Sequence, residues 1–248
     1  MNKKHSLIVG GTRGIGRVLV KAMINDSSFV SVIGKHYPME SDLNIKNVRF
    51  WTVDLLNQKK LQEVLTDIIN QNGKINNLIF SQRYKGKGDD WSGEIETSLT
   101  AIKNIIEYTK DKFDESNGSS IVIVSSIAGH FIADEQPLSY HVVKSALNQL
   151  ARYYAVKLGP KGIKVNCVSP GIIFKEEGTE FYEKNKRLFD IYKQITPLGR
   201  LCIPEDISNV ALFLCDSKSS FITGQNIVVD GGVSLQEHSS LSRNIMEV

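Results

Sequence analysis

The stretch Val9-Gly10-Gly11-Thr12-Arg13-Gly14-Ile15-Gly16 decides the fold class of this 248-residue chain. It follows the apolar residues 7–9, which predict a short buried strand, and it leads into residues 15–23, whose apolar side chains have helical spacing. Glycines permit positive φ angles and let a backbone come close to a phosphate. The N–H groups of the following helix's first turn would point at such an anion. We therefore interpret the stretch as a nucleotide-binding turn between a strand and a helix.

Two nucleotide motifs can be compared with this turn directly. A Walker A loop would end in Gly-Lys-Ser/Thr, whereas Gly16 is followed by Arg17 and Val18, which argues against an ATPase. The GxGxxG pattern is also absent, because the glycines at 10, 14 and 16 have GxxxGxG spacing. A tight turn without a ligand remains the alternative. The position of the turn, at the start of an alternating chain, favours a dinucleotide.

Apolar runs that predict strands alternate with helical patterns along nearly the whole chain. We predict strands at residues 7–9, 29–33, 48–53, 77–80, 121–124, 163–168 and 226–229, and helices at 15–23, 61–69, 95–113, 140–158 and 206–214. Strands 121–124 and 163–168 are almost continuously apolar, which is typical of a parallel sheet covered on both faces. The pattern predicts one α/β domain, a doubly wound parallel sheet of about seven strands flanked by helices. Ligands of such sheets bind beyond the carboxyl ends of the strands.

The composition is that of an ordinary globular domain. Hydrophobic residues make up 41% and charged residues 23%, and a formal net charge of +3 gives no indication of a nucleic-acid partner. No stretch approaches the ~20 apolar residues of a membrane span, so we expect no membrane partner. The three cysteines, Cys167, Cys202 and Cys215, form no CxxC pair. This argues against a disulfide scaffold or a metal site and favours a reducing, cytoplasmic compartment.

The residues after the second predicted strand bear on the identity of the dinucleotide. An acidic side chain there would accept a hydrogen bond from the ribose 2′-OH of NAD, whereas a cation would pair with the 2′-phosphate of NADP. The chain reads Gly34-Lys35-His36, without an acid, and Arg13 lies in the turn itself. Both cations favour NADP(H) over NAD(H). The alternative is that Lys35 is only a solvated surface residue.

Ser126, Tyr140 and Lys144 form a candidate catalytic set. Four of the eight tyrosines have a lysine four residues later, but only Tyr140 also has a serine upstream at the end of a predicted strand. A nearby lysine lowers a phenol pKa, so Tyr140 could exchange a proton with a carbonyl or an alcohol. Ser126 would stabilise charge on the substrate oxygen, and Lys144 would also reach the nicotinamide ribose. Taken singly, Ser126 could be a strand-end cap and Tyr140 a half-buried helix residue.

Together these segments resemble the short-chain dehydrogenase/reductase family over the chain as far as about Gly232. The glycine turn is similar to that family's TGxxxGIG motif, with Val9 in place of the usual threonine. Further matches are the active-site strand Ser125-Ser126-Ile127-Ala128-Gly129, the Tyr140/Lys144 pair, the Pro-Gly turn in residues 166–171, and the C-terminal signature in residues 223–225 and 229–232. The resemblance is to NADP-dependent, 3-oxoacyl-carrier-protein-reductase-like members.

The resemblance implies a Rossmann fold and roles for further residues. The turn residues Gly10, Thr12, Arg13, Gly14, Ile15 and Gly16 would hold the cofactor, with Lys35 as the second mark of NADP preference. Asp54 and Leu55 would touch the adenine. Pro170 and Gly171 would form the Pro-Gly turn, and the backbone of Ile173 would contact the nicotinamide amide. The family also implies a homo-oligomer, a tetramer or a dimer, whose interface uses the helices from Ile95 and from Tyr140.

Two departures from the family pattern stand out. The Asn-Asn-Ala-Gly that follows the fourth strand falls on Phe80-Ser81-Gln82-Arg83. The asparagine that organises a water for the proton relay falls on Ser98, which is therefore its candidate replacement. The basic loop at residues 83–88 would lie near the active-site edge. It allows two interpretations, a substrate that carries negative charge and a solvated loop, and we favour the second slightly.

The sequence thus predicts an NADP(H)-dependent oxidoreductase that interconverts a ketone and a secondary alcohol of a small molecule, with residues 1–232 as the catalytic domain. Residues 174–200 read as a polar connection with an amphipathic middle. Residues 233–248 are a polar tail and a candidate for a mobile segment. The alternative, suggested by the two departures, is a catalytically impaired dinucleotide-binding protein that serves as a sensor or assembly subunit. The retained Ser126, Tyr140 and Lys144 argue against it.

Overall fold

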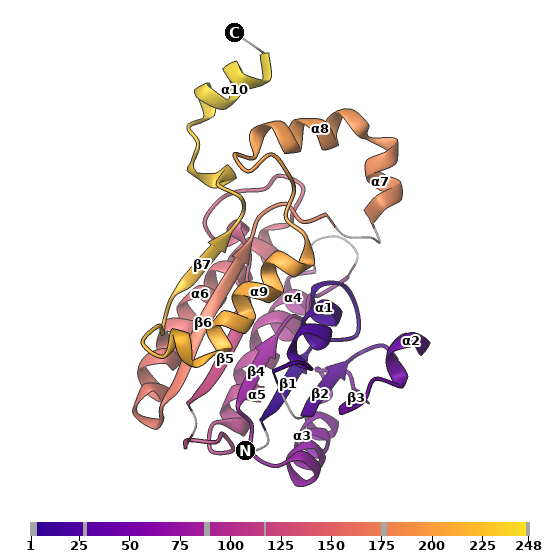
Figure 1. The fold of residues 1–248 in the computed structure, drawn as a ribbon, viewed down its shortest axis with the longest axis vertical. Helices are drawn as coiled ribbons and strands as arrows, with labels where there is room; N and C mark the ends of the chain where they lie inside the picture. Colours follow the sequence, from indigo (N-terminus) through magenta and orange to yellow (C-terminus); the bar gives the residue numbers. More distant parts are fainter. Residues whose placement is uncertain (1–3, 27–28, 87–89, 117, 175–177, 247–248) are drawn as a thin grey trace.

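A seven-stranded parallel sheet forms the centre of the molecule (Figure 1). The computed structural model describes residues 4–26, 29–86, 90–116, 118–174 and 178–246. The strands are β1 (His5–Val9), β2 (Phe29–Gly34), β3 (Val48–Thr52), β4 (Asn77–Phe80), β5 (Ser119–Val124), β6 (Ile163–Pro170) and β7 (Asn226–Val229). Their order, β3-β2-β1-β4-β5-β6-β7, confirms the predicted doubly wound Rossmann fold. The order reverses between β1 and β4, where such sheets bind their ligands.

The central strands are buried on both faces. β1, β4, β5 and β6 are buried along their whole length, as expected for the inner strands of a parallel sheet covered on both faces. Successive side chains point to opposite faces. Leu7 and Val9 therefore join one hydrophobic core, and Ile8 between them joins the other.

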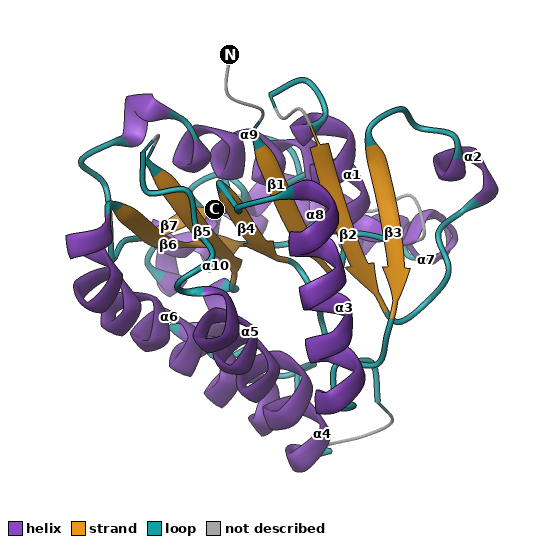
Figure 2. Ribbon diagram, turned by 90° about the horizontal axis from the view of Figure 1, so that it is seen from below, coloured by secondary structure: helices purple, strands orange, loops and turns teal. Residues whose placement is uncertain are grey.

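Helices cover both faces of the sheet (Figure 2). One layer contains α3 (Gln58–Asn72), α5 (Ala101–Thr109) and α6 (Leu138–Leu158), whose apolar faces share a core with alternate strand residues. The opposite layer contains α1 (Gly14–Met23) and α9 (Pro204–Cys215). Shorter pieces connect these elements: α2 (Glu40–Leu43), α4 (Trp91–Ile95), η2 (Ile127–Gly129), η3 (Gly159–Lys161), η5 (Ser217–Ser219) and η6 (Val233–Leu235).

Further helices lie beyond the carboxyl end of the sheet (Figure 1). They are α7 (Thr179–Lys184), α8 (Lys186–Ile195) and α10 (His238–Met246), and α10 packs against α8. The side-chain amide of Gln236 donates to the carbonyl oxygen of Ile195 at 2.6 Å. The predicted polar connection therefore contains α7 and α8, and the predicted tail contains η6 and α10.

The prediction of one helix over residues 95–113 was wrong at the C-terminal end. The structure has α4, a π-helical turn η1 (Glu96–Thr100) and then α5, which ends at Thr109. Thr109 donates its hydroxyl proton to the carbonyl oxygen of Ile105 at 2.7 Å. Phe113 has the periodicity of a helix residue, but it leaves the helix and pairs with Ile75, where it is buried. A long-range contact therefore overrides the local pattern.

Candidate active site

The glycine turn is folded tightly against the end of β4. Gly10 has φ +84°, and a Cβ atom at this position would overlap the backbone of Gln82. A Cβ atom on Gly16 would in turn overlap the carbonyl oxygen of Gly10. Both positions therefore require glycine. The backbone N–H of Ser81 donates to the carbonyl oxygen of Val9 at 2.8 Å, so the turn and the segment after β4 meet at the switch point of the sheet.

The rest of the turn leads directly into α1. Arg13 is extended and exposed immediately before the helix, and Gly14, Ile15 and Gly16 form the first helical turn. Thr12 is buried and packs against Gly34 at the end of β2. The structure thus brings these predicted cofactor residues together at the N-terminus of α1, where backbone N–H groups favour an anion.

Lys35 and Asp54 form an ion pair that spacing did not predict. Lys35 follows β2 and Asp54 follows β3, and Nζ lies 2.8 Å from Oδ2. The hydrogen bond from Lys35 lowers the pKa of the Asp54 carboxyl. The side chains are 65% and 43% exposed, so the pair is weakly held. The neighbouring Leu55 is buried.

Two hydrogen bonds fasten α6 to the carboxyl end of β5. The hydroxyl of Ser125 donates to the carbonyl oxygen of Lys144 at 3.0 Å. The ammonium of Lys144 donates to the carbonyl oxygen of Val124 at 3.1 Å and lies 5.4 Å from the ring centre of Tyr140. Lys144 is buried, whereas Tyr140 is half-buried. The structure therefore brings Tyr140 and Lys144 together beside the residues that precede Ser126.

Ser126 stands directly after β5 with an extended backbone. Its Oγ accepts a hydrogen bond from the backbone N–H of Ala128 at 3.1 Å and so caps η2. This bond uses a lone pair of the oxygen and leaves the hydroxyl proton able to donate. The cap and a contact with a substrate oxygen are therefore compatible.

Ser98 lies inside the π-helical turn η1 and is buried. Its Oγ accepts from the backbone N–H of Tyr84 at 3.3 Å. The Tyr84 hydroxyl donates to the carboxylate of Asp90, and this bond is the main reason that the pKa of Tyr84 is raised. Ser98 therefore holds the segment after β4 against η1. Single π turns are frequent at functional sites.

Arg83 occupies a position that sequence reasoning singled out only as part of a basic loop. Its guanidinium carbon lies 5.0 Å from the ring centre of Tyr140. Its Nη2 donates to Oε1 of Gln136, in the segment before α6, at 2.9 Å. The contact joins residues that lie more than fifty positions apart in the chain. Lys87 and Gly88, at the end of the same predicted loop, lie outside the described residues.

The Pro-Gly turn closes the other side of the site. β6 ends at Pro170, and the N–H of Gly171 donates to the carbonyl oxygen of Val229 at 3.1 Å. Ile173 pairs with Cys202 in a short parallel bridge. The bonds of this bridge run from Cys202 to Ile172 and from Phe174 to Cys202, so they do not use the N–H and C=O of Ile173 itself. These groups are suited to a ligand amide.

A further polar group lies beside the glycine turn. The side-chain amide of Gln82 is buried, and neither its oxygen nor its nitrogen has a hydrogen-bond partner among the described residues. Buried polar atoms normally have partners. A ligand at the switch point would supply them.

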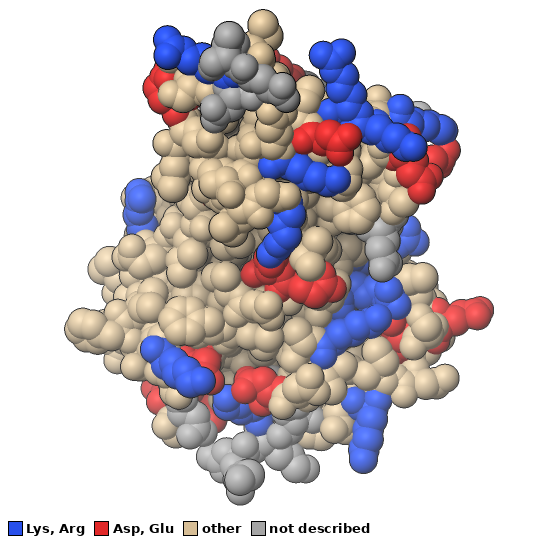
Figure 3. Space-filling model, turned by 45° about the horizontal axis from the view of Figure 1, so that its top comes forward, with Lys and Arg blue, Asp and Glu red and all other residues tan. Residues whose placement is uncertain are grey.

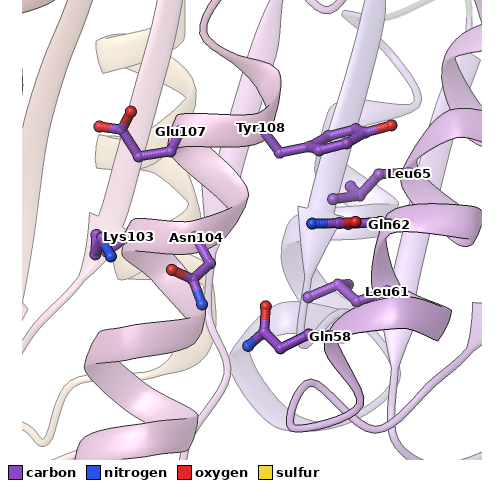
Figure 4. Close-up of a pocket in the computed structure, with 8 residues that line it drawn as sticks. All are labelled: Gln58, Leu61, Gln62, Leu65, Lys103, Asn104, Glu107 and Tyr108. Atoms are coloured by element: carbon purple, nitrogen blue, oxygen red, sulfur yellow. The ribbon is translucent and has the colours of Figure 1, made fainter.

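One cavity lies away from these residues (Figure 4). It has a volume of about 260 Å³ and lies between α3 and α5, lined by Gln58, Leu61, Gln62, Leu65, Lys103, Asn104, Glu107 and Tyr108. None of the predicted site residues lines it. This cavity is therefore separate from the predicted site.

The surface around the sheet edge carries charges of both signs. Lys and Arg side chains are interspersed with Asp and Glu on the face shown in Figure 3. In the part of the chain that the structure describes, no three His, Cys, Asp or Glu side chains gather as a metal site would need. Within the same residues, no helix has the length and apolar character to cross a bilayer.

Comparisons with known proteins agree with this geometry. A family model described as enoyl-(acyl carrier protein) reductase matches residues 10–234. A chloroplastic tropinone reductase homologue of Arabidopsis thaliana is 30% identical over 249 residues, which cover 95% of this chain and 77% of that protein. A 3-oxoacyl-[acyl-carrier-protein] reductase of Aquifex aeolicus is 29% identical, with coverage of 93% and 97%.

A solved short-chain dehydrogenase of Leptospira borgpetersenii with bound NAD⁺ has a TM-score of 0.78 at 30% identity, with coverage of 94% and 93%. The chain belongs to the short-chain dehydrogenase/reductase family. This short-chain dehydrogenase/reductase is an NAD(P)-dependent oxidoreductase. A second similar structure, ElxO with NADP bound, has a TM-score of 0.83 at 25% identity, with coverage of 94% and 100%. The neighbours thus hold either nicotinamide dinucleotide.

Proposed function

We propose that this protein is an NADP(H)-dependent reductase that converts a ketone into a secondary alcohol, with Tyr140 as the proton donor. The observation that carries the proposal is the contact chain from the end of β5 through Lys144 to the ring of Tyr140. It puts a cation beside a phenol at the sheet edge where the glycine turn also lies.

The residues at the switch point fit a dinucleotide. The glycine turn leads into the N-terminus of α1, where backbone N–H groups favour an anion, and the buried amide of Gln82 lacks protein partners among the described residues. We propose that the cofactor is held by Gly10, Thr12, Arg13, Gly14, Ile15, Gly16, Asp54, Leu55, Tyr140, Lys144, Pro170, Gly171 and Ile173. When bound, it supplies the hydride.

The protein side chains would then bind the substrate oxygen and supply its proton. Ser126 donates a hydrogen bond to the ketone oxygen and orients it. Tyr140 transfers its phenolic proton to that oxygen as the alcohol forms. The ammonium of Lys144 lies 5.4 Å from the ring centre of Tyr140 and would stabilise the negative charge that develops on the phenol oxygen during the proton transfer. In the oxidation direction the same groups act in reverse.

Ser98 takes the place of the family's asparagine in this proposal. Its oxygen already accepts from the N–H of Tyr84, so one lone pair and the hydroxyl proton remain for a water. An asparagine amide has more donor and acceptor sites than a hydroxyl. We therefore propose that Ser98 supports the proton relay more weakly than asparagine would.

We assign NADP(H) as the preferred cofactor because of Arg13 and Lys35. The ion pair between Lys35 and Asp54 is exposed, and exposed ion pairs contribute only about 0–1 kcal/mol to stability. Lys35 could therefore leave Asp54 and bind a 2′-phosphate with little loss of stability. Arg13 is exposed at the start of α1 and would approach the same phosphate.

The assembly that we propose is a homo-oligomer, a dimer or a tetramer, that uses the outer face of α6. Val142, Tyr153 and Val156 are exposed on this helix and share one face. We also place the protein in the cytoplasm, because its three cysteines are buried free thiols.

The test of the function is the substitution Tyr140→Phe. NADPH oxidation with accepted ketones should fall by about 10²–10⁴-fold, the usual contribution of a positioned acid, while NADPH affinity by titration calorimetry changes little. Tyr108→Phe is the matched control. Tyr108 also has a lysine four residues later, but it lies on α5 at the cavity that is separate from the predicted site. Unchanged turnover in Tyr140→Phe would refute the mechanism.

A further inference from the structure

Arg83 puts a second cation beside the reacting tyrosine. The guanidinium carbon of Arg83 lies 5.0 Å from the ring centre of Tyr140, and the ammonium of Lys144 lies 5.4 Å from the same centre. Lys144 has a role in the reaction as proposed above, whereas the transfer of hydride and proton does not require Arg83. This residue also stands where the family motif has glycine, so its side chain is an addition to the site.

The backbone on either side of Arg83 is held in place. Gln82 packs against Gly10, so closely that the glycine cannot carry a side chain. The N–H of Tyr84 donates to Ser98, and the hydroxyl of Tyr84 donates to Asp90. The side chain of Arg83 is tied to Gln136 at 2.9 Å. The backbone of Arg83 is therefore fixed, and its exposed guanidinium is oriented toward Tyr140 by one solvent-accessible hydrogen bond.

The charge of this guanidinium is not neutralised within the described residues. Gln136 is a neutral partner and takes one N–H of the five that a guanidinium offers. No carboxylate of the described residues, including Asp134 and Glu135 beside Gln136, lies within ion-pair distance of Arg83. A carboxylate or phosphate would pair with the remaining donors in a charge-assisted, bidentate fashion.

We propose that Arg83 binds a negatively charged group of the substrate, so that the preferred substrates are small ketones with a carboxylate or phosphate close to the carbonyl. This proposal rests on the ketone reduction proposed above. Because Arg83 lies against the ring of Tyr140, one small molecule can contact both residues. Its carbonyl oxygen would accept from Tyr140 and Ser126, while its anionic group would pair with Arg83.

The competing interpretation is that Arg83 only ties the segment after β4 to the segment before α6. The two interpretations differ in what a variant should change. An anion site changes the preference for charged over neutral substrates. A structural tie changes both kinds of substrate alike, and it should depend on Gln136 as much as on Arg83.

The experiment measures kcat/KM with NADPH for matched ketone pairs, acetoacetate against methyl acetoacetate and dihydroxyacetone phosphate against dihydroxyacetone. In the wild type we expect the charged member to be favoured by about tenfold or more in at least one pair, the range of a charge-assisted hydrogen bond. Arg83→Gln should remove most of that ratio, and Arg83→Lys should keep part of it. The pair that responds identifies carboxylate or phosphate.

Two variants serve as controls. Gln136→Ala removes the tie but keeps the charge, so the ratio should remain. Arg49→Gln makes the same change on the exposed surface of β3, away from the site, and should leave the ratio as in the wild type. A wild type without preference for the charged ketone would overturn the proposal. Equal losses for both members of a pair in Arg83→Gln and Gln136→Ala would also overturn it.

A binding measurement separates this proposal from the proposed function. Malonate and malonamide are titrated calorimetrically into the complex of the protein with NADPH, since neither can be reduced as a ketone. Malonate binding that is lost in Arg83→Gln supports the anion site even if no ketone is turned over. If neutral ketones are reduced but malonate binds equally well to the wild type and to Arg83→Gln, the proposed reductase function stands and the proposed anion site is wrong.

Discussion

Arg13 and Lys35 are the residues on which the cofactor assignment depends. They come from two different turns, and the structure adds that Lys35 is already paired with Asp54 at 2.8 Å. Asp54 supplies the negative charge that faces Lys35. By family resemblance, Asp54 would also contact the adenine. Under the proposed function, cofactor binding would therefore be coupled to this ion pair.

The cofactor preference can be tested at these two residues. Arg13→Ser combined with Lys35→Asp should lower kcat/KM for NADPH by about 10²-fold or more relative to NADH, because two charge-assisted contacts to the 2′-phosphate are lost and a repulsive carboxylate is added. Steady-state kinetics with both cofactors measure the effect. Lys46→Asp, at the exposed residue two positions before β3, is the matched control and should leave the preference as it was. If the double variant keeps its preference, the assignment is wrong.

Among the elements, α2 is a short helix that the Arg17 side chain ties to α1. It has only four residues, and helical spacing did not predict it. Arg17 of α1 donates from Nε to Oδ2 of Asp42 at 2.6 Å and from Nη2 to Oδ1 at 2.9 Å. Asp42 is buried, and the hydrogen bond from Arg17 lowers the pKa of its carboxyl. The pair therefore joins the helix after the glycine turn to the segment after β2.

Arg17→Leu should reduce the free energy of unfolding by about 3 kcal/mol at pH 7, because it leaves a buried carboxylate without its partner. The pKa of Asp42 is lower in the folded than in the unfolded protein, so the stabilisation is present above ~3.9 and is lost as the pH falls through the folded value. Urea unfolding from pH 7 to pH 3 should show the two proteins converging.

The matched control for this tie is Lys60→Leu, which breaks the exposed pair between Lys60 and Glu63. Exposed pairs contribute about 0–1 kcal/mol, so this variant should differ little from the wild type at any pH. A difference between Arg17→Leu and the wild type that stays constant down to pH 3 would contradict the role given to Asp42.

At the scale of the whole molecule, the outer face of α6 is more apolar than an exposed helix requires. Tyr153 is 56% exposed and Val156 is 75% exposed. The same helix carries Tyr140 and Lys144 near its N-terminus. Exposed apolar patches on a soluble domain mark contact surfaces. A partner copy on this face would cover the helix that holds the proposed proton donor, which would link assembly to activity.

Val156→Glu should therefore shift the protein to a smaller species, because a buried carboxylate in the interface would lack a partner. Analytical ultracentrifugation measures the change, with circular dichroism to show that the fold persists. Met39→Glu adds the same charge at an exposed apolar residue beside α2 and should leave the assembly intact. A wild type that sediments as a monomer would sink the proposed oligomer.

Local pattern was enough to predict where the strands and main helices lie along the chain, and to place the glycine turn between the first strand and helix. It also singled out Ser126, Tyr140 and Lys144 as candidates, and the structure shows that Lys144 lies beside Tyr140. These features follow from side-chain periodicity and from backbone conformations that only certain residue types can adopt, such as the positive φ of Gly10. Helix ends were less predictable. Phe113, for example, fits a helix by its spacing, but it lies outside the helix and forms a parallel bridge with Ile75.

The contacts between distant segments were decided only by the tertiary structure. Lys35 meets Asp54 because β2 and β3 end side by side, and Arg83 meets Tyr140 because the segments after β4 and before α6 converge at one edge of the sheet. Sequence spacing carries no information about which strand ends become neighbours or how far a side chain reaches across them. The sequence by itself therefore determined the residues available for chemistry, and the packing of the sheet edge decided which of them face one another.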